Sequence, residues 1–491
     1  MITLGLGGVS LGWLVGLRSP LLLLAFSVVA SSGVRTLTFL VVTSLPVAPE
    51  SKFVWFIAQI GAIAIGAAFG WRSRTFWVGG VTAIIAVLVA VVLKFPLGIG
   101  ERHHSDSATI VAIATLLFQN DEPSGGTKRG LSYPLLLALG PENAILSTIT
   151  VYIFIGLCAV IVWVFLRLRE ISPRPAFFDY LALAFVTLAS TTPMIRVIPF
   201  YMNGHTLVAL GLSLVLMVFI RTVVRGNPLS RTDIAVLGIS GFVVGTTRME
   251  AFILFVLILV ALTSTEHFDR KDSPIVWPAL VTVPGVSALT WFSWAGSNPF
   301  PFSMYLGWSG LALAAVAAMW LYSGSGGSFR RHTPVGVAGF LALGLVVVLV
   351  QLGGPSALVS TIDTVVFGGG GWGYFFPAVL ATVLLLGVHH LSPAVGTLWA
   401  ALASGVFFTL LIKYIESGGF GRGVFWDTLN RSWIHLLPLV TVLILLSLLD
   451  TLSGKPGLGN RPLLRKLGRS DTVTSGKTPL VPSSEKNPQG L

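Results

Sequence analysis

Long apolar stretches separated by short polar turns dominate this chain. About fifteen stretches recur, each close to the roughly 20 residues that a helix needs to cross the hydrocarbon core of a membrane. They cover residues 2–17, 20–45, 53–70, 76–95, 142–166, 177–195, 204–220, 233–247, 249–264, 275–295, 304–323, 334–352, 374–388, 394–412 and 432–450. Strands of a membrane β-barrel would instead be short and alternating. The pattern predicts an all-α polytopic membrane protein with about 13–15 transmembrane helices.

Composition agrees with this class. The mean hydropathy is +0.86, and only 10% of the residues are charged. A single cysteine, Cys158, excludes an intramolecular disulfide and a cysteine-based metal site. We expect no cleavable signal peptide, because no basic residue precedes the first apolar run and further spans follow it directly.

Lysine and arginine gather in alternate loops, and this pattern predicts the topology. The positive-inside rule places the basic loops and the tail in the cytoplasm. These loops contain Arg18; Arg72 and Arg74; Arg167, Arg169 and Arg174; Arg221, Arg225 and Arg231; Arg270 and Lys271; and Arg330 and Arg331. The net charge of +12 is therefore a topology signal, which attraction to anionic lipid reinforces, and we expect no nucleic-acid partner.

The same pattern divides the chain into four parts. Residues 1–95 form N-terminal transmembrane helices, and residues 96–141 form an outer loop. Residues 142–450 form the transmembrane core. Residues 451–491 are rich in Gly, Pro, Ser and Lys, which predicts a disordered cytoplasmic tail.

The outer loop holds the densest group of ionisable residues, within Glu101–Gly140. Apolar residues at Ile110, Val111, Ala114 and Leu117 recur at helical spacing and predict a short helix on the outer membrane surface. Asp106, near the start of this helix, is either an N-terminal cap or a carboxylate base. His103 and His104 assist it, bind a metal or do neither. Asp121, Glu122 and Glu142 are the candidates for a second acidic site residue beside Asp106.

Three arginines stand at the predicted outer ends of spans. Arg248 occurs with Glu250 in GTTRMEAF, Arg196 precedes His205 in TTPMIRVIPFYMNGH, and Arg431 opens the last span in NRSWIHLLPLV. Each arginine either extends to lipid head groups or supplies a fixed cation for a phosphate that arrives within the membrane.

The order of these motifs resembles the polyprenyl-phosphate-sugar-dependent membrane glycosyltransferases of the GT-C fold. An Asp begins a helix in the outer loop (HSDSATIVAIATLLF), and KRGLSYPLLLALG follows it. A central pair of helices is joined by Thr-Arg-x-Glu, and a late Arg precedes an apolar run with proline. The outer loop of that family usually follows the first span, whereas about four spans precede it here. The N-terminal part, LGWLVGLRSPLLLLAFSVVASSGV, is similar to actinobacterial membrane proteins of uncertain function.

The resemblance implies a GT-C-like fold with an outer-face juxtamembrane helix, in a multi-pass protein of the bacterial plasma membrane. It implies transfer of a sugar from a polyprenyl-phosphate donor to a cell-envelope acceptor, with Asp106 as the catalytic base. It leaves open whether a divalent cation takes part, and no metal ligand is assigned. The predicted substrate-binding residues are Arg431, Arg248, Arg196, Glu250, His205, His104 and Tyr133.

Two other functions fit the same pattern. Helices broken by Gly and Pro suit a transporter or flippase for a lipid-linked or amphipathic solute. Transporters, however, tend to place ionisable residues near the midplane of the membrane, whereas here, Arg35 apart, they lie mainly at the ends of the spans. The third alternative is a non-catalytic assembly partner in cell-envelope synthesis.

Overall fold

A computed structural model describes the chain at residues 1–43, 50–94, 112–117, 132–138, 143–197, 204–225, 229–263 and 433–452, and at scattered positions between 282 and 402. Within these residues the fold is all-helical. Its elements are α1 (Ile2–Val15), α2 (Pro20–Thr43), α3 (Ser51–Gly70), α4 (Arg74–Lys94), α6 (Ser132–Leu137), α7 (Asn143–Ile171), α8 (Pro175–Thr191), α9 (Pro193–Val197), α10 (His205–Arg225), α11 (Arg231–Thr247), α12 (Met249–Thr263), the 3₁₀ turn η3 (Trp433–His435) and α20 (Leu437–Leu452).

Five of these helices are long and apolar enough to cross a membrane, which makes the chain a multi-pass membrane protein. They are Pro20–Val42, Ser51–Gly70, Arg74–Leu93, Thr148–Ile171 and His205–Thr222. Shorter apolar helices cover three other predicted spans, at Ile2–Val15, Pro175–Thr191 and Trp433–Leu449. The predicted spans at 304–323 and 334–352 lie outside the described residues, as do most residues of those at 275–295, 374–388 and 394–412.

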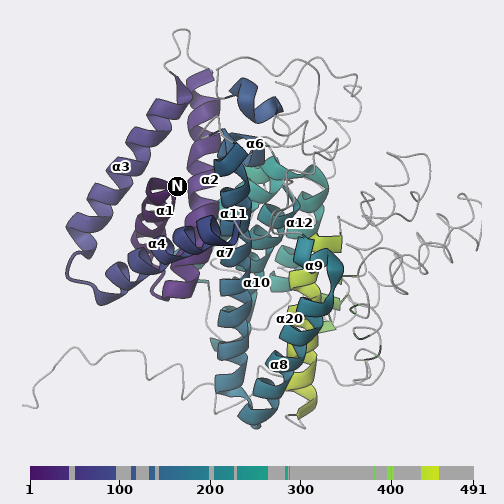
Figure 1. Cartoon of the computed structure of the whole chain (residues 1–491). Helices are drawn as coiled ribbons and strands as arrows, with labels where there is room; N and C mark the ends of the chain where they lie inside the picture. Colours follow the sequence, from purple (N-terminus) through teal and green to yellow (C-terminus); the bar gives the residue numbers. More distant parts are fainter. Residues whose placement is uncertain are drawn as a thin grey trace, which may run out of the picture.

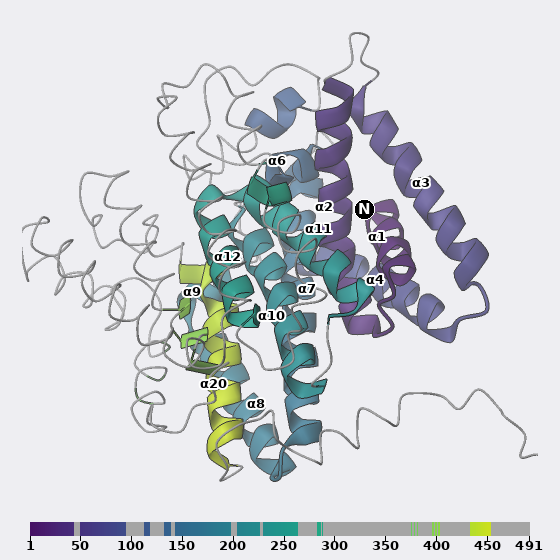
Figure 2. The ribbon, with the colours of Figure 1, turned by 180° about the vertical axis from the view of Figure 1, so that it is seen from behind.

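The bundle has a buried centre, and α3 lies at an edge with an exposed apolar surface (Figures 1 and 2). The span of α10 is 94% buried, against 28% for α3 and 39% for α4. Large apolar side chains of α3 point outward, among them Ile57 at 67% and Phe69 at 74% exposure. Hydrocarbon chains of lipid would cover such a surface as well as protein does, so α3 and α4 form the rim of the described bundle.

Close helix contact depends on a glycine in α1. A Cβ atom added to Gly8 would lie 2.0 Å from the carbonyl oxygen of Ser27 in α2. Only glycine permits this approach of two helix backbones, an arrangement typical of membrane helix pairs.

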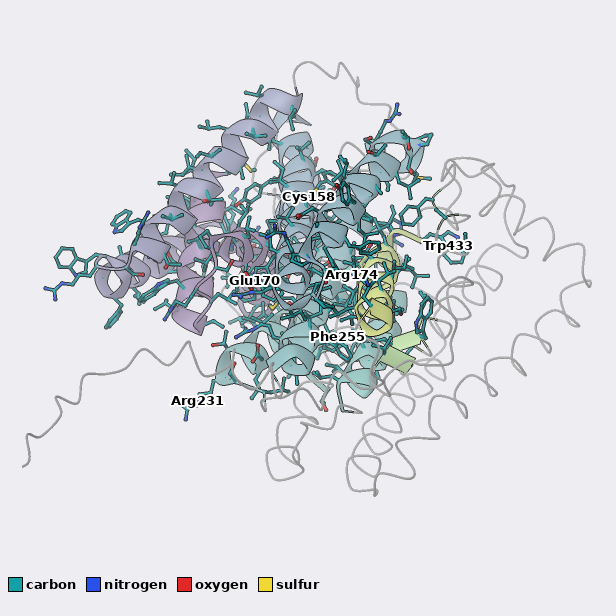
Figure 3. The ribbon with its side chains drawn as sticks, turned by 90° about the horizontal axis from the view of Figure 1, so that it is seen from below. Cys158, Glu170, Arg174, Arg231, Phe255 and Trp433 are labelled. Carbon is teal, nitrogen blue, oxygen red and sulfur yellow. The ribbon has the colours of Figure 1, made fainter. Side chains whose placement is uncertain are left out.

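Among the described residues, the basic turns lie at one end of the bundle. Thr232, at the start of α11, donates a hydrogen bond of 2.9 Å to the carbonyl of Val15, at the end of α1. Figure 3 looks at this end, where Glu170 closes α7, Arg174 precedes α8 and Arg231 begins α11. The segregation agrees with the predicted alternation of basic loops, while the assignment of this end to the cytoplasm stays a prediction.

The opposite end carries parts of the predicted outer loop. Residues 112–117 are helical, and Ile113, Ala114 and Leu117 are buried in the bundle. Helix α6 follows, with all six of its residues buried. The sequence pattern predicted the first of these short helices but not the second. The predicted tail beyond Leu452 lies outside the described residues.

Candidate functional site

Arg248 occupies a one-residue break between two helices. It ends α11 in an extended conformation, with φ of −151° and ψ of 117°, and Met249 begins α12. The preceding Thr246 and Thr247 each donate a side-chain hydrogen bond of 2.6 Å to a carbonyl of their own helix. Such bonds compete with the helical backbone pattern and favour a helix end. The break leaves the half-buried Arg248 side chain at the end of the bundle opposite the basic turns.

His205 begins α10 directly beside this break. It is fully buried, and its Nε2 atom lies 3.3 Å from the Nη2 atom of Arg248. The preceding Gly204 makes the approach possible. A Cβ atom at this position would lie 2.6 Å from Cγ2 of Thr247 and 3.5 Å from Cβ of Tyr133.

A second histidine completes what we call the histidine–arginine cluster, formed by His205, Arg248 and His435. His435 belongs to η3, is 3% exposed, and places Nε2 2.7 Å from Nδ1 of His205. The two imidazole rings are 4.7 Å apart between centroids and inclined by 40°. The pair joins residues that are 230 positions apart in the sequence.

The direction of the hydrogen bonds in the cluster follows from arginine chemistry. A guanidinium group has donors only, so Nη2 of Arg248 donates to Nε2 of His205. We therefore assign the proton of a neutral His205 to Nδ1, which donates to Nε2 of His435. The proton of His435 is then on Nδ1. This chain of donation is consistent with both imidazoles neutral, and it links the Arg248 side chain to two buried rings.

Tyr133 supports the cluster rather than reaching into it. Its ring is 1% exposed and flanks Gly204, while its hydroxyl is hydrogen-bonded to Oγ1 of Thr150 in α7 at 2.9 Å. The neighbouring Ser132 shares hydrogen bonds with Thr36 of α2, at 2.8 Å, and with Thr246 of α11. Helix α6 is thereby attached to the same end of α11 that carries Arg248.

The structure places Arg196 elsewhere. Its side chain is exposed, and Nε donates to the carbonyl of Ser190 at the end of α8. In the part of the chain that the structure describes, this bond ties α9 to α8, and no hydrogen bond joins Arg196 to His205 or Arg248.

Four predicted site residues are not placed. Asp106, His104 and Arg431 lie outside the described residues, and Glu250 is described only as the second backbone position of α12. His435, by contrast, was not among the predicted site residues. Its position four residues after Arg431, in NRSWIHLLPLV, is the signal that would have selected it.

Metal binding finds no support among the described residues, where no group of three or more His, Cys, Asp or Glu side chains is suitably placed. The two histidines instead approach each other at hydrogen-bonding distance. No protein family, curated protein or solved structure matches the chain. The function is therefore inferred from the residues of the cluster and from the order of the sequence motifs.

Proposed function

We propose that the chain is a membrane glycosyltransferase of the GT-C type. It moves a sugar from a polyprenyl-phosphate donor to a cell-envelope acceptor on the outer face of the membrane, by direct inverting displacement. The observation that carries this proposal is the arginine at the break between α11 and α12, which is hydrogen-bonded to the buried His205, itself paired with the buried His435.

An arginine at that position suits a phosphate carried by a lipid. Its guanidinium is planar and grips two phosphate oxygens at once. Ionisable side chains that enter the membrane region are costly, and they commonly mark substrate sites. His205 is buried and its ring is hydrogen-bonded to His435, so its contact with Arg248 restricts the guanidinium before the ligand arrives. Such preorganisation favours binding of the charge that develops during a reaction.

The proposed step is a single displacement at the anomeric carbon. Asp106 takes the proton of the acceptor hydroxyl, acting as a general base. The acceptor oxygen forms a bond to the anomeric carbon while the bond from that carbon to the phosphate oxygen breaks. The bonding electrons leave with polyprenyl phosphate, whose added negative charge Arg248 and Arg431 stabilise.

Reconstitution in liposomes tests the proposal. The full chain is supplied with a panel of polyprenyl-phosphate sugars, and the release of polyprenyl phosphate is measured. We expect Asp106→Asn to insert normally and to lose about 10²–10⁴-fold in transfer, because asparagine keeps the shape but not the basicity. Arg248→Met should lose most of the transfer, and Arg248→Lys should retain more. Arg174→Met, on the exposed basic end, is the matched control and should be fully active.

Two results would contradict the proposal. Normal transfer by Asp106→Asn would show that Asp106 is not the catalytic base and would leave only its role as a helix cap. Passage of the intact donor across the bilayer without release of polyprenyl phosphate would instead support a transporter or flippase.

A further inference from the structure

A second arginine lies inside the described bundle, far from the cluster in sequence. Arg35 of α2 is 0% exposed. Its Nη1 atom donates a hydrogen bond of 3.0 Å to Oγ of Ser51, the first residue of α3. Within the described part of the chain, Nε and Nη2 of the same guanidinium are buried and have no hydrogen-bond partner.

The two unpartnered nitrogen atoms indicate which kind of hydrogen-bond acceptor would suit this site. Nε and Nη2 share one edge of the guanidinium and form the fork that binds two oxygens of a carboxylate or phosphate. A buried cation without a counter-charge is strongly unfavourable, and so is a buried donor without an acceptor. This fork suits an anion with two oxygen atoms on one side.

The level of Arg35 in the membrane indicates where that anion comes from. Ser51 is flanked by Glu50 and Lys52, which form an ion pair of 2.9 Å with side chains 45% and 26% exposed. Charged and partly exposed side chains are typical of the membrane interface, so we infer that Arg35, bonded to Ser51, lies near the level of the lipid head groups. The α3 helix starts at the same place, and its N-terminal end attracts anions. Glu50, its N-cap residue, makes no side-chain hydrogen bond to the first amides.

We propose that Arg35 and the N-terminus of α3 form a binding site for a phosphate oxyanion, supplied by the head group of a membrane phospholipid. Helix α3 contacts the bundle through one stripe, formed by Ser51, Trp55, Gln59, Ala62, Gly66 and Gly70. The site is separate from the histidine–arginine cluster and does not depend on the proposed transfer reaction.

Thermal unfolding of the full chain in detergent micelles tests the site. The probes are dihexanoyl phosphatidic acid, the uncharged dihexanoylglycerol and inorganic phosphate. We expect only the first to raise the unfolding temperature, since it combines the phosphate with acyl chains. Arg35→Met should weaken its apparent affinity by about ten- to hundredfold, because charge-assisted hydrogen bonds are lost. Arg35→Lys should bind with intermediate affinity, since it keeps the charge but not the fork.

Controls separate this site from other cations. Arg18→Met, at an exposed arginine before α2, should bind the phosphatidic acid as the original chain does. An equal shift with inorganic phosphate would identify free phosphate as the ligand of the same fork. If Arg35→Met does not fold, Arg35→Lys and Ser51→Ala make the comparison. Unchanged affinity in these variants, or no response of the original chain to either phosphate probe, would overturn the proposal.

Discussion

The contact between His205 and His435 allows a direct test of how the cluster is built. His205→Leu removes two hydrogen bonds, one from Arg248 and one to His435. A bond to a charged group contributes about 1.5–3 kcal/mol and a neutral one about 0.5–1.5 kcal/mol. We therefore expect His205→Leu to lower the free energy of unfolding by about 2–4 kcal/mol. His435→Leu removes the neutral bond and leaves the bond from Arg248 to His205, so it should cost about 0.5–1.5 kcal/mol.

The double variant distinguishes a direct contact from two separate effects. Because the bond between the histidines is lost only once, the double variant should cost about 1 kcal/mol less than the sum of the single variants. The measurement is reversible unfolding in mixed detergent micelles, followed by tryptophan fluorescence. Tyr133→Phe combined with His435→Leu is the matched control. The Tyr133 hydroxyl bonds Thr150 instead, so these two costs should add within about 0.5 kcal/mol.

Strict additivity of His205→Leu and His435→Leu would refute the reasoning. It would mean that the two rings do not share a hydrogen bond in the membrane. The assigned direction of donation from Arg248 through His205 to His435 would then fail as well, and with it the argument that the arginine is held in place.

Three further predictions concern the same end of the bundle. Ser132→Ala should cost about 1–2 kcal/mol of unfolding free energy, because it detaches α6 from Thr36 and Thr246, whereas Ser213→Ala, which loses only a bond within α10, should cost less. Gly204→Ala should destabilise the fold through its clash with Cγ2 of Thr247, and Thr247→Ser should restore much of the loss. In a chain with Cys158 replaced by alanine, cysteine at Ser124 should react with an impermeant maleimide in intact cells, and cysteine at Ser470 should not. The reverse labelling would overturn the topology.

Local structure was predictable from the sequence because hydropathy reports on neighbouring residues. The span predicted at 20–45 corresponds to α2 at Pro20–Thr43, and that at 249–264 to α12 at Met249–Thr263. The pairing of His205 with His435 was not predictable, since hydropathy carries no information about contacts 230 positions apart. Arg196 shows the same limit, because its bond to Ser190 depends on the turn between α8 and α9. Helix α6 was missed because six residues are too few for a periodic pattern.

The two ends of the bundle are held by different chemistry, and the difference bears on the proposed site. At the basic end, ion pairs join successive helices: Arg169 with Asp179 at 2.7 Å, and Arg221 with Asp233 at 2.8 Å. The first of these pairs is about half exposed, so salt screens it and its contribution is small. At the opposite end, hydrogen bonds between hydroxyl groups and between imidazoles connect the helices, in buried positions where salt has little effect. Salt that weakens the Arg169–Asp179 pair should therefore leave the position of Arg248 unchanged, as a fixed cation for a charged ligand requires.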